Sequence, residues 1–179
     1  MNFCSNCGHP VAHRVPPGDN LPRYVCDNCH TIHYINPRNV VGCVVEWEGA
    51  ILLCRRAIEP RHGYWTAPAG FMECGETVAE GAAREVREEA LAEVDVGSML
   101  AVVNVPHVDQ VHIMFRATLR DGKYGVGEET LESALVPIED VPWGELAFPS
   151  VRFALERYLD DRREQVERLH TTRVERMKR

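Results

Sequence analysis

Two Cys-x-x-Cys pairs constrain the fold of this chain more than any other feature. Cys4 and Cys7 form the first pair, and Cys26 and Cys29 form the second. Each pair can present two sulfur atoms from one tight turn, and two turns complete the tetrahedron that zinc prefers. A module this short cannot bury enough apolar surface to fold alone, so metal binding would supply its folding free energy. We therefore predict a zinc ribbon over residues 1–36.

The donor set decides what such an ion does. Four thiolates leave no position for water, so the predicted Zn²⁺ is structural. His9, His30 and His33 are close in sequence to the two pairs. Either one of them replaces a cysteine or, more simply, they are exposed loop residues. The competing use of the thiols is a pair of disulfides. It is disfavoured because the N-terminus lacks a secretory pattern, which predicts a cytoplasmic location with reduced thiols.

The composition bears on possible partners. The chain has 179 residues, 45% apolar and 26% charged, a balance typical of one globular domain with a small module. No apolar run approaches the roughly 20 residues that cross a bilayer, so no membrane partner is expected. The net charge is −7, which disfavours nucleic acid because a phosphate backbone needs a concentrated positive field. The Arg-rich tail after Asp161 alternates bases with acids and is interpreted as a solvated helix face.

Residues 37–179 are predicted to form one α/β domain. Residues 40–47 and 50–55 are apolar, β-rich runs joined at Glu48-Gly49, which indicates a hairpin. Further strands are expected at 99–105, 111–119 and 131–138, and helices at 77–91 and after residue 150. Ser150 is the expected N-cap of the last helix. Its apolar stripe predicts a C-terminal amphipathic helix that packs on the sheet or on a second subunit: Val151, Ala154, Leu155, Tyr158 and Leu159.

The chemistry is concentrated on the helix at 77–91. Thr77-x-x-Glu80 is a capping box that places its start. Glu85 and Glu89 are four residues apart and share a face, while Glu88 lies one turn from Glu85. Three carboxylates so close repel one another unless cations neutralise them, and hard oxygen ligands suit Mg²⁺ or Mn²⁺.

The alternative is a solvated acidic face with Arg84 and Arg87 as partners. The preceding loop favours the metal site. Residues 65–70 read Trp-Thr-Ala-Pro-Ala-Gly, and Gly75 comes just before the helix. Because glycines allow the backbone to approach a ligand closely, the loop and helix together indicate a site for metal ions and phosphate.

These residues resemble the signature of the Nudix hydrolase family, G-x5-E-x7-R-E-U-x-E-E-x-G-U, where U is a bulky aliphatic residue. The chain departs from it at Leu91, where the family has a glycine that helps to end the helix, and at Ala92, which is small for the final position. Neither change removes a metal ligand. The fixed positions that match with the correct spacing are Gly70, Glu76, Arg84, Glu85, Glu88 and Glu89.

A four-cysteine ribbon before such a domain is similar to the subgroup containing NADH pyrophosphatases and the plant plastid pyrophosphatases that act on ADP-ribose and FAD. The S-Q-P-W-P-F-P-x-S motif usual in NADH pyrophosphatases is missing, and only Ala-Phe-Pro-Ser at 147–150 remains. Pro106 follows the signature at a distance similar to that in ADP-ribose hydrolases of the family. The resemblance therefore favours ADP-ribose or FAD over NADH. It also implies a homodimer and an α/β/α sandwich around a mixed sheet.

The resemblance implies a role for each matching residue. The metal ions would bind phosphate oxygens and lower the pKa of a water that attacks phosphorus. An arginine paired with a glutamate would orient the carboxylates. The implied metal ligands are Glu85, Glu88 and Glu89 with the carbonyl of Ala69, and the implied supporting residues are Gly70, Glu76 and Arg84.

Other candidates lie outside the signature. The family often draws its catalytic base from a later loop or strand, which makes Glu129 and Glu132 candidates. Glu128 is equally near, and all three also fit a solvated acidic run. Substrate contacts are predicted for cations and one aromatic ring near the signature, each of which also fits a surface role: Arg55, Arg56, Arg61 and Phe71.

Two functions follow. The first is a metal-dependent pyrophosphohydrolase that cleaves a nucleoside diphosphate linked to another moiety. The second is a non-catalytic sensor that binds a nucleotide or a nucleic acid. The intact set of Glu85, Glu88 and Glu89 favours the enzyme, because a degenerate sensor is expected to lose a ligand. An RNA-end hydrolase is disfavoured by the acidic balance.

Overall fold

The computed structural model describes residues 1–175 and divides into two compact units, Met1–Pro37 and a second unit that begins at Arg38. Each unit has its own sheet. No helix in the described part of the chain combines the length and the apolarity that a bilayer crossing requires.

The first unit is a three-stranded antiparallel sheet with almost no core. Its strands are β1 (Val11–Arg14), β2 (Arg23–Cys26) and β3 (Ile32–His33), in that spatial order. Only four of its residues are buried, and two of these are thiols: Cys4, Pro16, Val25 and Cys26. Apolar burial this small cannot offset the entropy of ordering the unit, which is the physical reason to expect a metal in it.

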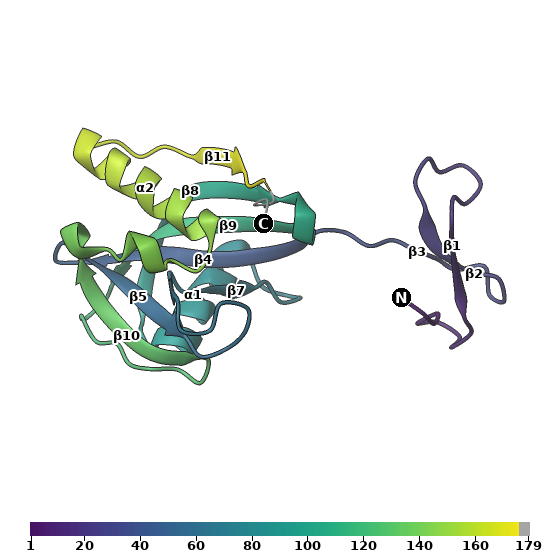
Figure 1. Ribbon diagram of the computed structural model, residues 1–179, viewed down its shortest axis with the longest axis horizontal. Helices are drawn as coiled ribbons and strands as arrows, with labels where there is room; N and C mark the ends of the chain where they lie inside the picture. Colours follow the sequence, from purple (N-terminus) through teal and green to yellow (C-terminus); the bar gives the residue numbers. More distant parts are fainter. Residues whose placement is uncertain (176–179) are drawn as a thin grey trace. The chain divides into compact units, whose positions relative to one another are not determined.

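The second unit is built on one mixed sheet with the strand order β10-β5-β4-β9-β8-β11 (Figure 1). The central strand β4 runs parallel to β9 and antiparallel to β5. Short strands β6 and β7 pair with β5 and β4. The strands are β4 (Arg38–Trp47), β5 (Ala50–Arg56), β6 (Trp65–Thr66), β7 (Ala69–Phe71), β8 (Val94–Val105), β9 (Gln110–Leu119), β10 (Thr130–Pro137) and β11 (His170–Arg173). The helices are α1 (Val78–Ala90) and α2 (Pro149–Glu164), with single 3₁₀ turns at Pro106–Val108, Ile138–Asp140 and Trp143–Glu145.

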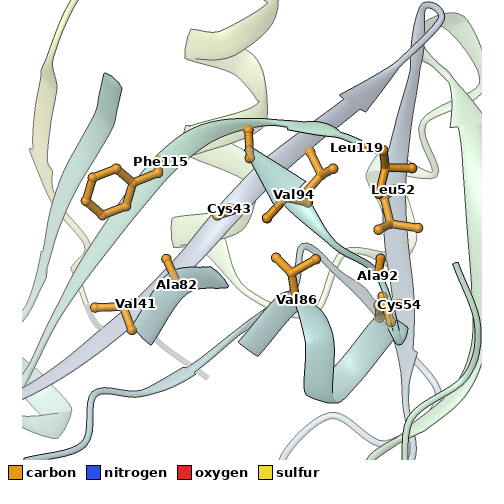
Figure 2. Packing of buried hydrophobic residues seen from close by; sticks show 13 residues of the cluster. Val41, Cys43, Leu52, Cys54, Ala82, Val86, Ala92, Val94, Phe115 and Leu119 are labelled. Carbon is orange, nitrogen blue, oxygen red and sulfur yellow. The ribbon is translucent and has the colours of Figure 1, made fainter. Parts of the chain in front are cut away.

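Alternation along β4 and β5 builds two cores. Cys43 and Leu52 pack with Val86 of α1 in one cluster, whereas Val44 and Leu53 pack with Leu155 of α2 in the other. Successive side chains of a strand point to opposite faces, so α1 and α2 cover opposite faces of the sheet. Figure 2 shows Val86 and Ala82 of α1 against Cys43 and Leu52. The predicted α/β/α sandwich around a mixed sheet is confirmed.

The ends of the elements follow their sequence signals. Thr77 and Glu80 form the predicted capping box, with Glu80 N donating to Thr77 Oγ1 at 3.2 Å and Thr77 N donating to Glu80 Oε2 at 2.8 Å. Glu48 and Gly49 both have positive φ, at 48° and 85°, as a tight hairpin turn requires. The predicted hairpin is therefore present.

Two expectations at the C-terminal end are wrong. Ser150 is not the N-cap of α2, because the helix begins at Pro149, whose fixed φ suits the first helical position, and Phe148 is the N-cap. The basic tail is not a continuous helix either. Gln165 takes a left-handed conformation that ends α2, and residues 170–173 then form β11 beside β8. Residues 176–179 of that tail lie outside the described residues.

Candidate metal and active site

The four cysteines of the first unit meet at one point. Their Sγ atoms all lie within 4.8 Å of one another, with Cys4 and Cys29 3.6 Å apart and Cys7 and Cys26 3.5 Å apart. These separations exclude disulfide bonds, whose S–S length is about 2.05 Å. Sulfurs bound to one zinc at about 2.3 Å would stand roughly 3.8 Å apart in a tetrahedron. The quartet therefore fits a closed, structural Zn²⁺ site.

The nearby histidines lie around this quartet rather than in it. His33 Nε2 is 3.2 Å from Cys4 Sγ, and His9 Nδ1 is 3.2 Å from the carbonyl of Cys7. His30 is exposed and occupies a left-handed turn. His33 is thus placed to hydrogen-bond to a ligand sulfur, which is the role that outer partners play around metal ligands.

On the second unit, Arg84 joins three glutamates. Its Nη2 donates to Glu76 Oε1 at 2.8 Å and its Nε to Glu76 Oε2 at 3.0 Å. Its Nη1 donates to Glu85 Oε1 at 2.7 Å and to Glu88 Oε2 at 2.9 Å. Arg84, together with the Glu73 amide, lowers the pKa of Glu76 to about 2. The bidentate pair with Glu76 fixes the guanidinium, which then orients the other two carboxylates.

Glu85 and Glu89 are buried acids. Each residue is only 8% exposed. Burial raises the pKa of both, and repulsion from Glu85 adds to the effect at Glu89, whose pKa reaches about 8. Glu89 Oε2 is buried and has no hydrogen-bond partner. A buried acceptor without a partner is costly, and a hard divalent cation is the group that would satisfy it.

Residues of β7 lie against these two carboxylates. Ala69 and Gly70 lie on β7, which pairs with β4 at Gly42 and Val41. A side chain at Gly70 would overlap the carboxylate of Glu85. The backbone of Ala69 is also near enough to Glu89 to lower its pKa. The structure thus brings four of the sequence candidates together: Ala69, Gly70, Glu85 and Glu89.

Glu88 is arranged differently. Its side chain is 58% exposed, and its contact in this network is with Arg84. Over residues 1–175, only the cysteine quartet places three or more Cys, His, Asp or Glu ligand atoms within 4.8 Å of one another. The three glutamates therefore do not converge as a set: Glu85 and Glu88 share Nη1 of Arg84, whereas Glu89 Oε2 is buried without a partner.

The candidate bases also separate. Glu129 is exposed, yet its charge raises the pKa of both Glu85 and Glu89. Glu132 is instead 3.6 Å from Arg55 Nη1, across the pairing of β10 with β5. Glu128 is exposed. Of these two candidates, Glu129 therefore acts electrostatically on the buried acids, and Glu132 pairs with Arg55.

The candidate substrate residues have different partners. The charge of Arg56 lowers the pKa of Glu89, and its guanidinium lies 5.0 Å from the ring of Phe148. Arg55 donates to the carbonyl of Gly63 at 2.8 Å. Two further candidates stand against other side chains, with Arg61 over Tyr64 at 5.4 Å and Arg38 over Phe71 at 4.6 Å. Among these candidates, Arg56 is thus the one with a marked electrostatic effect on Glu89. Phe148, which sequence reasoning did not single out, is its aromatic neighbour.

Both units match known protein families. Residues 2–35 match the zinc-ribbon family described as Nudix N-terminal, and residues 36–157 match the NUDIX domain. The crystal structure of a NUDIX hydrolase from Nitrosomonas europaea superimposes with a TM-score of 0.92 at 47% identity, covering 97% of this chain and 100% of that one. An ADP-ribose pyrophosphatase of Methanocaldococcus jannaschii is 33% identical over 119 residues, 64% of this chain and 69% of that protein.

A more distant relative has a different named substrate. The NAD-capped RNA hydrolase NudC of Salmonella typhi is 29% identical over 141 residues, 78% of this chain. The match spans 53% of that protein, so the chain covers about half the length of such relatives.

Fold, signature and ribbon define a Nudix pyrophosphohydrolase with an N-terminal zinc-ribbon module. The chain belongs to the Nudix family. The resemblance inferred from the signature is confirmed for the family and for its ribbon-bearing members, and the predicted enzyme class is confirmed with it.

Proposed function

We propose that the protein hydrolyses the pyrophosphate bond of a nucleoside diphosphate linked to another moiety, with Mg²⁺ or Mn²⁺ bound at Glu85 and Glu89. ADP-ribose and FAD are the favoured substrates, ahead of NADH. The observation that carries this proposal is the pair of buried carboxylates, one of which has an oxygen without a partner. The 33% identity to an ADP-ribose pyrophosphatase supports the choice of substrate.

The roles of the side chains follow from their charges. Bound divalent ions supply Lewis acidity, which neutralises the pyrophosphate and acidifies water. Glu85 and Glu89, with the Ala69 carbonyl, would hold these ions, and Glu88 would contribute to a further one. Glu129 would accept a proton from the attacking water while the oxygen of that water forms a bond to phosphorus. The bridging P–O bond then breaks and releases a nucleoside monophosphate.

The remaining candidates would orient these groups. Arg84, fixed by Glu76, holds Glu85 and Glu88. Gly70 leaves room for the Glu85 carboxylate. The charge of Arg56 lowers the pKa of Glu89, and this arginine would contact a substrate phosphate. Arg55, Arg61 and Phe71 would line the approach, and Glu132 would hold Arg55 rather than act as a base.

A substrate panel tests the proposal. The protein is incubated with Mg²⁺ and ADP-ribose, FAD, NADH, dinucleoside polyphosphates or NAD-capped RNA, and nucleoside monophosphate release is followed. ADP-ribose or FAD should be cleaved fastest, and Glu128→Gln, a change at an exposed acid, should behave as wild type. If NAD-capped RNA were cleaved fastest, the favoured substrate would instead be that of the Salmonella relatives. Tight binding without cleavage of anything in the panel would favour the sensor.

We further propose that the cysteine quartet holds one structural Zn²⁺. Elemental analysis should give about one zinc per chain. Cys26→Ser should unfold residues 1–37, because the ribbon buries almost nothing else, and should leave the second unit folded. Its stability can be followed separately, since all three tryptophans (Trp47, Trp65 and Trp143) lie beyond the ribbon. A ribbon that stays ordered without metal would contradict the assignment.

A homodimer and a cytoplasmic location are also proposed, from the family resemblance and from the reduced thiols that a zinc ribbon requires. Light scattering on the purified full chain would give twice the mass of 20.2 kDa for a dimer. A monomeric mass at working concentration would remove the dimer from the proposal.

A further inference from the structure

The segment between β9 and β10 crosses the C-terminal end of α1. We call residues 122–129 the strap. It contains Gly122, Gly125 and Gly127, and it ends at Glu129, immediately before β10. By sequence it is a glycine-containing loop. In the structure it makes specific contacts with the helix that carries Glu85 and Glu89.

The strap supplies hydrogen-bond donors to the last carbonyls of α1. Gly125 N donates to the carbonyl of Ala90 at 2.6 Å, and Gly127 N donates to the carbonyl of Glu89 at 3.1 Å. The last carbonyls of a helix have no partners within it. The family glycine that helps to end this helix is replaced by Leu91, which takes a left-handed conformation with φ 47°. The strap therefore completes a helix end that the signature glycine does not make here.

The fit is closest at Gly127. A side chain there would overlap the backbone carbonyl of Glu88. A side chain at Gly125 would meet only the side chain of Leu91, at 3.2 Å. Gly127 does not have a positive φ, so its substitution acts by steric overlap with the helix backbone and not by backbone strain.

The strap is also tied on its far side. Thr130 N donates to the carbonyl of Gly127 at 3.1 Å, and Ala57 N donates to the carbonyl of Glu129 at 2.9 Å. Ala57 directly follows Arg56, the arginine whose charge acts on Glu89. Glu129 is thus held between the end of α1 and the end of β5, two residues beyond the hydrogen bond to Glu89.

We propose that the strap is a positioning element for hydrolysis, in which Gly127 locks the strap to α1 and thereby fixes the place of Glu129 relative to Glu85 and Glu89. The inference rests on the proposed function, because it gives Glu129 its task. Gly127 is a positioning residue that acts through Glu129. A side chain at Gly127 would push the strap off the helix and displace Glu129, and a displacement of about 1 Å can lower a rate by roughly 100-fold.

The test is a double-mutant cycle with a matched glycine control. Gly127→Ala is expected to lower kcat roughly 10- to 100-fold and to leave KM nearly unchanged. In the Glu129→Gln background the same change should have little further effect, because the base it positions is already gone. Gly125→Ala, in the same strap, should retain nearly full kcat. Wild-type kcat in Gly127→Ala, or an equal loss in both backgrounds, would overturn the inference.

Hydrogen exchange supplies a readout that does not need turnover. The amides of Gly125 and Gly127 should be protected in the wild type and in Gly125→Ala, and should lose protection in Gly127→Ala while Val86 of α1 keeps its own. Unprotected amides in the wild type would overturn the inference even if hydrolysis is confirmed. Protected amides in a chain that hydrolyses nothing would leave the strap in place as a helix cap, and would overturn both the proposed function and the positioning role.

Discussion

The two helices cover opposite faces of one sheet, and each buries an acid. On α2, Asp161 is 1% exposed, and its Oδ2 accepts hydrogen bonds from Arg116, His170 at 3.0 Å and the Arg168 amide at 3.1 Å. Its Oδ1 has no hydrogen-bond partner but lies 3.7 Å from the cationic Arg168 Nη1. Burial alone would raise the pKa of Asp161, yet the His170 and Arg168 contacts keep it below its ordinary value. On α1, burial and a second acid raise the pKa of Glu89 to about 8.

The difference separates two uses of a buried carboxylate. Where protein cations and donors compensate the charge, as at Asp161, the acid holds secondary structure together: it joins α2 to β9 and to the segment before β11. Where compensation is withheld, as at Glu89, the carboxyl group lacks a protein cation and can release its proton to bind a cation from outside. A raised pKa in a buried acid is thus a more specific sign of a binding site than acidity in the sequence.

The largest expected effect is on turnover at α1. Glu89→Gln should reduce kcat by at least about 1000-fold, which corresponds to roughly 4 kcal/mol in the activation barrier. It should not destabilise the magnesium-free protein, because it removes an uncompensated charge. Steady-state kinetics measure kcat, and unfolding followed by tryptophan fluorescence measures the stability. Normal turnover of Glu89→Gln would show that Glu89, like Asp161, is a structural acid and would remove the contrast between the two helices.

At α2 the reverse is expected. Asp161→Asn leaves Arg116 buried without its counter-ion, and such losses typically destabilise by about 3–5 kcal/mol. Urea unfolding followed by tryptophan fluorescence measures this free energy. The activity of the folded fraction should stay near that of wild type. A variant as stable as wild type would show that Asp161 contributes little net stabilisation.

The pH dependence should have opposite signs at the two sites. In magnesium-free buffer, the raised pKa of Glu89 gives stability that is present below pH 4.5 and is lost as pH rises to about 8. The lowered pKa of Asp161 gives stability that is present above pH 3.8 and is lost below it. Unfolding curves measured across this pH range should show that Glu89→Gln does not lose stability as the pH rises to 8. If the stability of wild type and of Glu89→Gln changed in parallel with pH, the pH dependence assigned to Glu89 would be wrong.

The smallest expected effects are at the helix ends. Leu91 and Gln165 end α1 and α2 with φ values of 47° and 57°, and a side chain in this conformation costs roughly 1–2 kcal/mol. Gln165→Gly should therefore stabilise by up to about 1 kcal/mol. Leu91→Gly should gain less, because Leu91 packs beside Gly125 of the strap. Thermal unfolding of both variants makes the comparison, and an equal gain would argue against that packing.

Much of the fold was predictable because its signals are local. The apolar, β-rich runs at 40–47 and 50–55, the Glu48-Gly49 turn and the capping box at Thr77 are each specified within a few neighbours. The strand β11 was not predictable, because its residues are polar and it depends on pairing with β8, far away in the sequence. The start of α2 was misplaced at Ser150 because two different N-terminal signals, proline and serine, stand side by side.

The candidate site divides in the same way. Helical spacing placed Glu85 and Glu89 on one face, and the resemblance to the family signature implied the supporting role of Arg84. The signature treated the three glutamates as one set, whereas burial distinguishes Glu85 and Glu89 from Glu88. The choice among Glu128, Glu129 and Glu132 depends on how the strap folds over α1, and sequence spacing carries no such information.

The alternation of β4 has a consequence for how the chain can vary in length. Val41, Cys43 and Val45 serve one core, and Val44 serves the other. A single inserted residue in this strand would send each later side chain to the wrong layer and deprive both helices of their packing at once. Insertions and deletions during divergence should therefore accumulate in the connections, while the central ladder keeps a constant residue count.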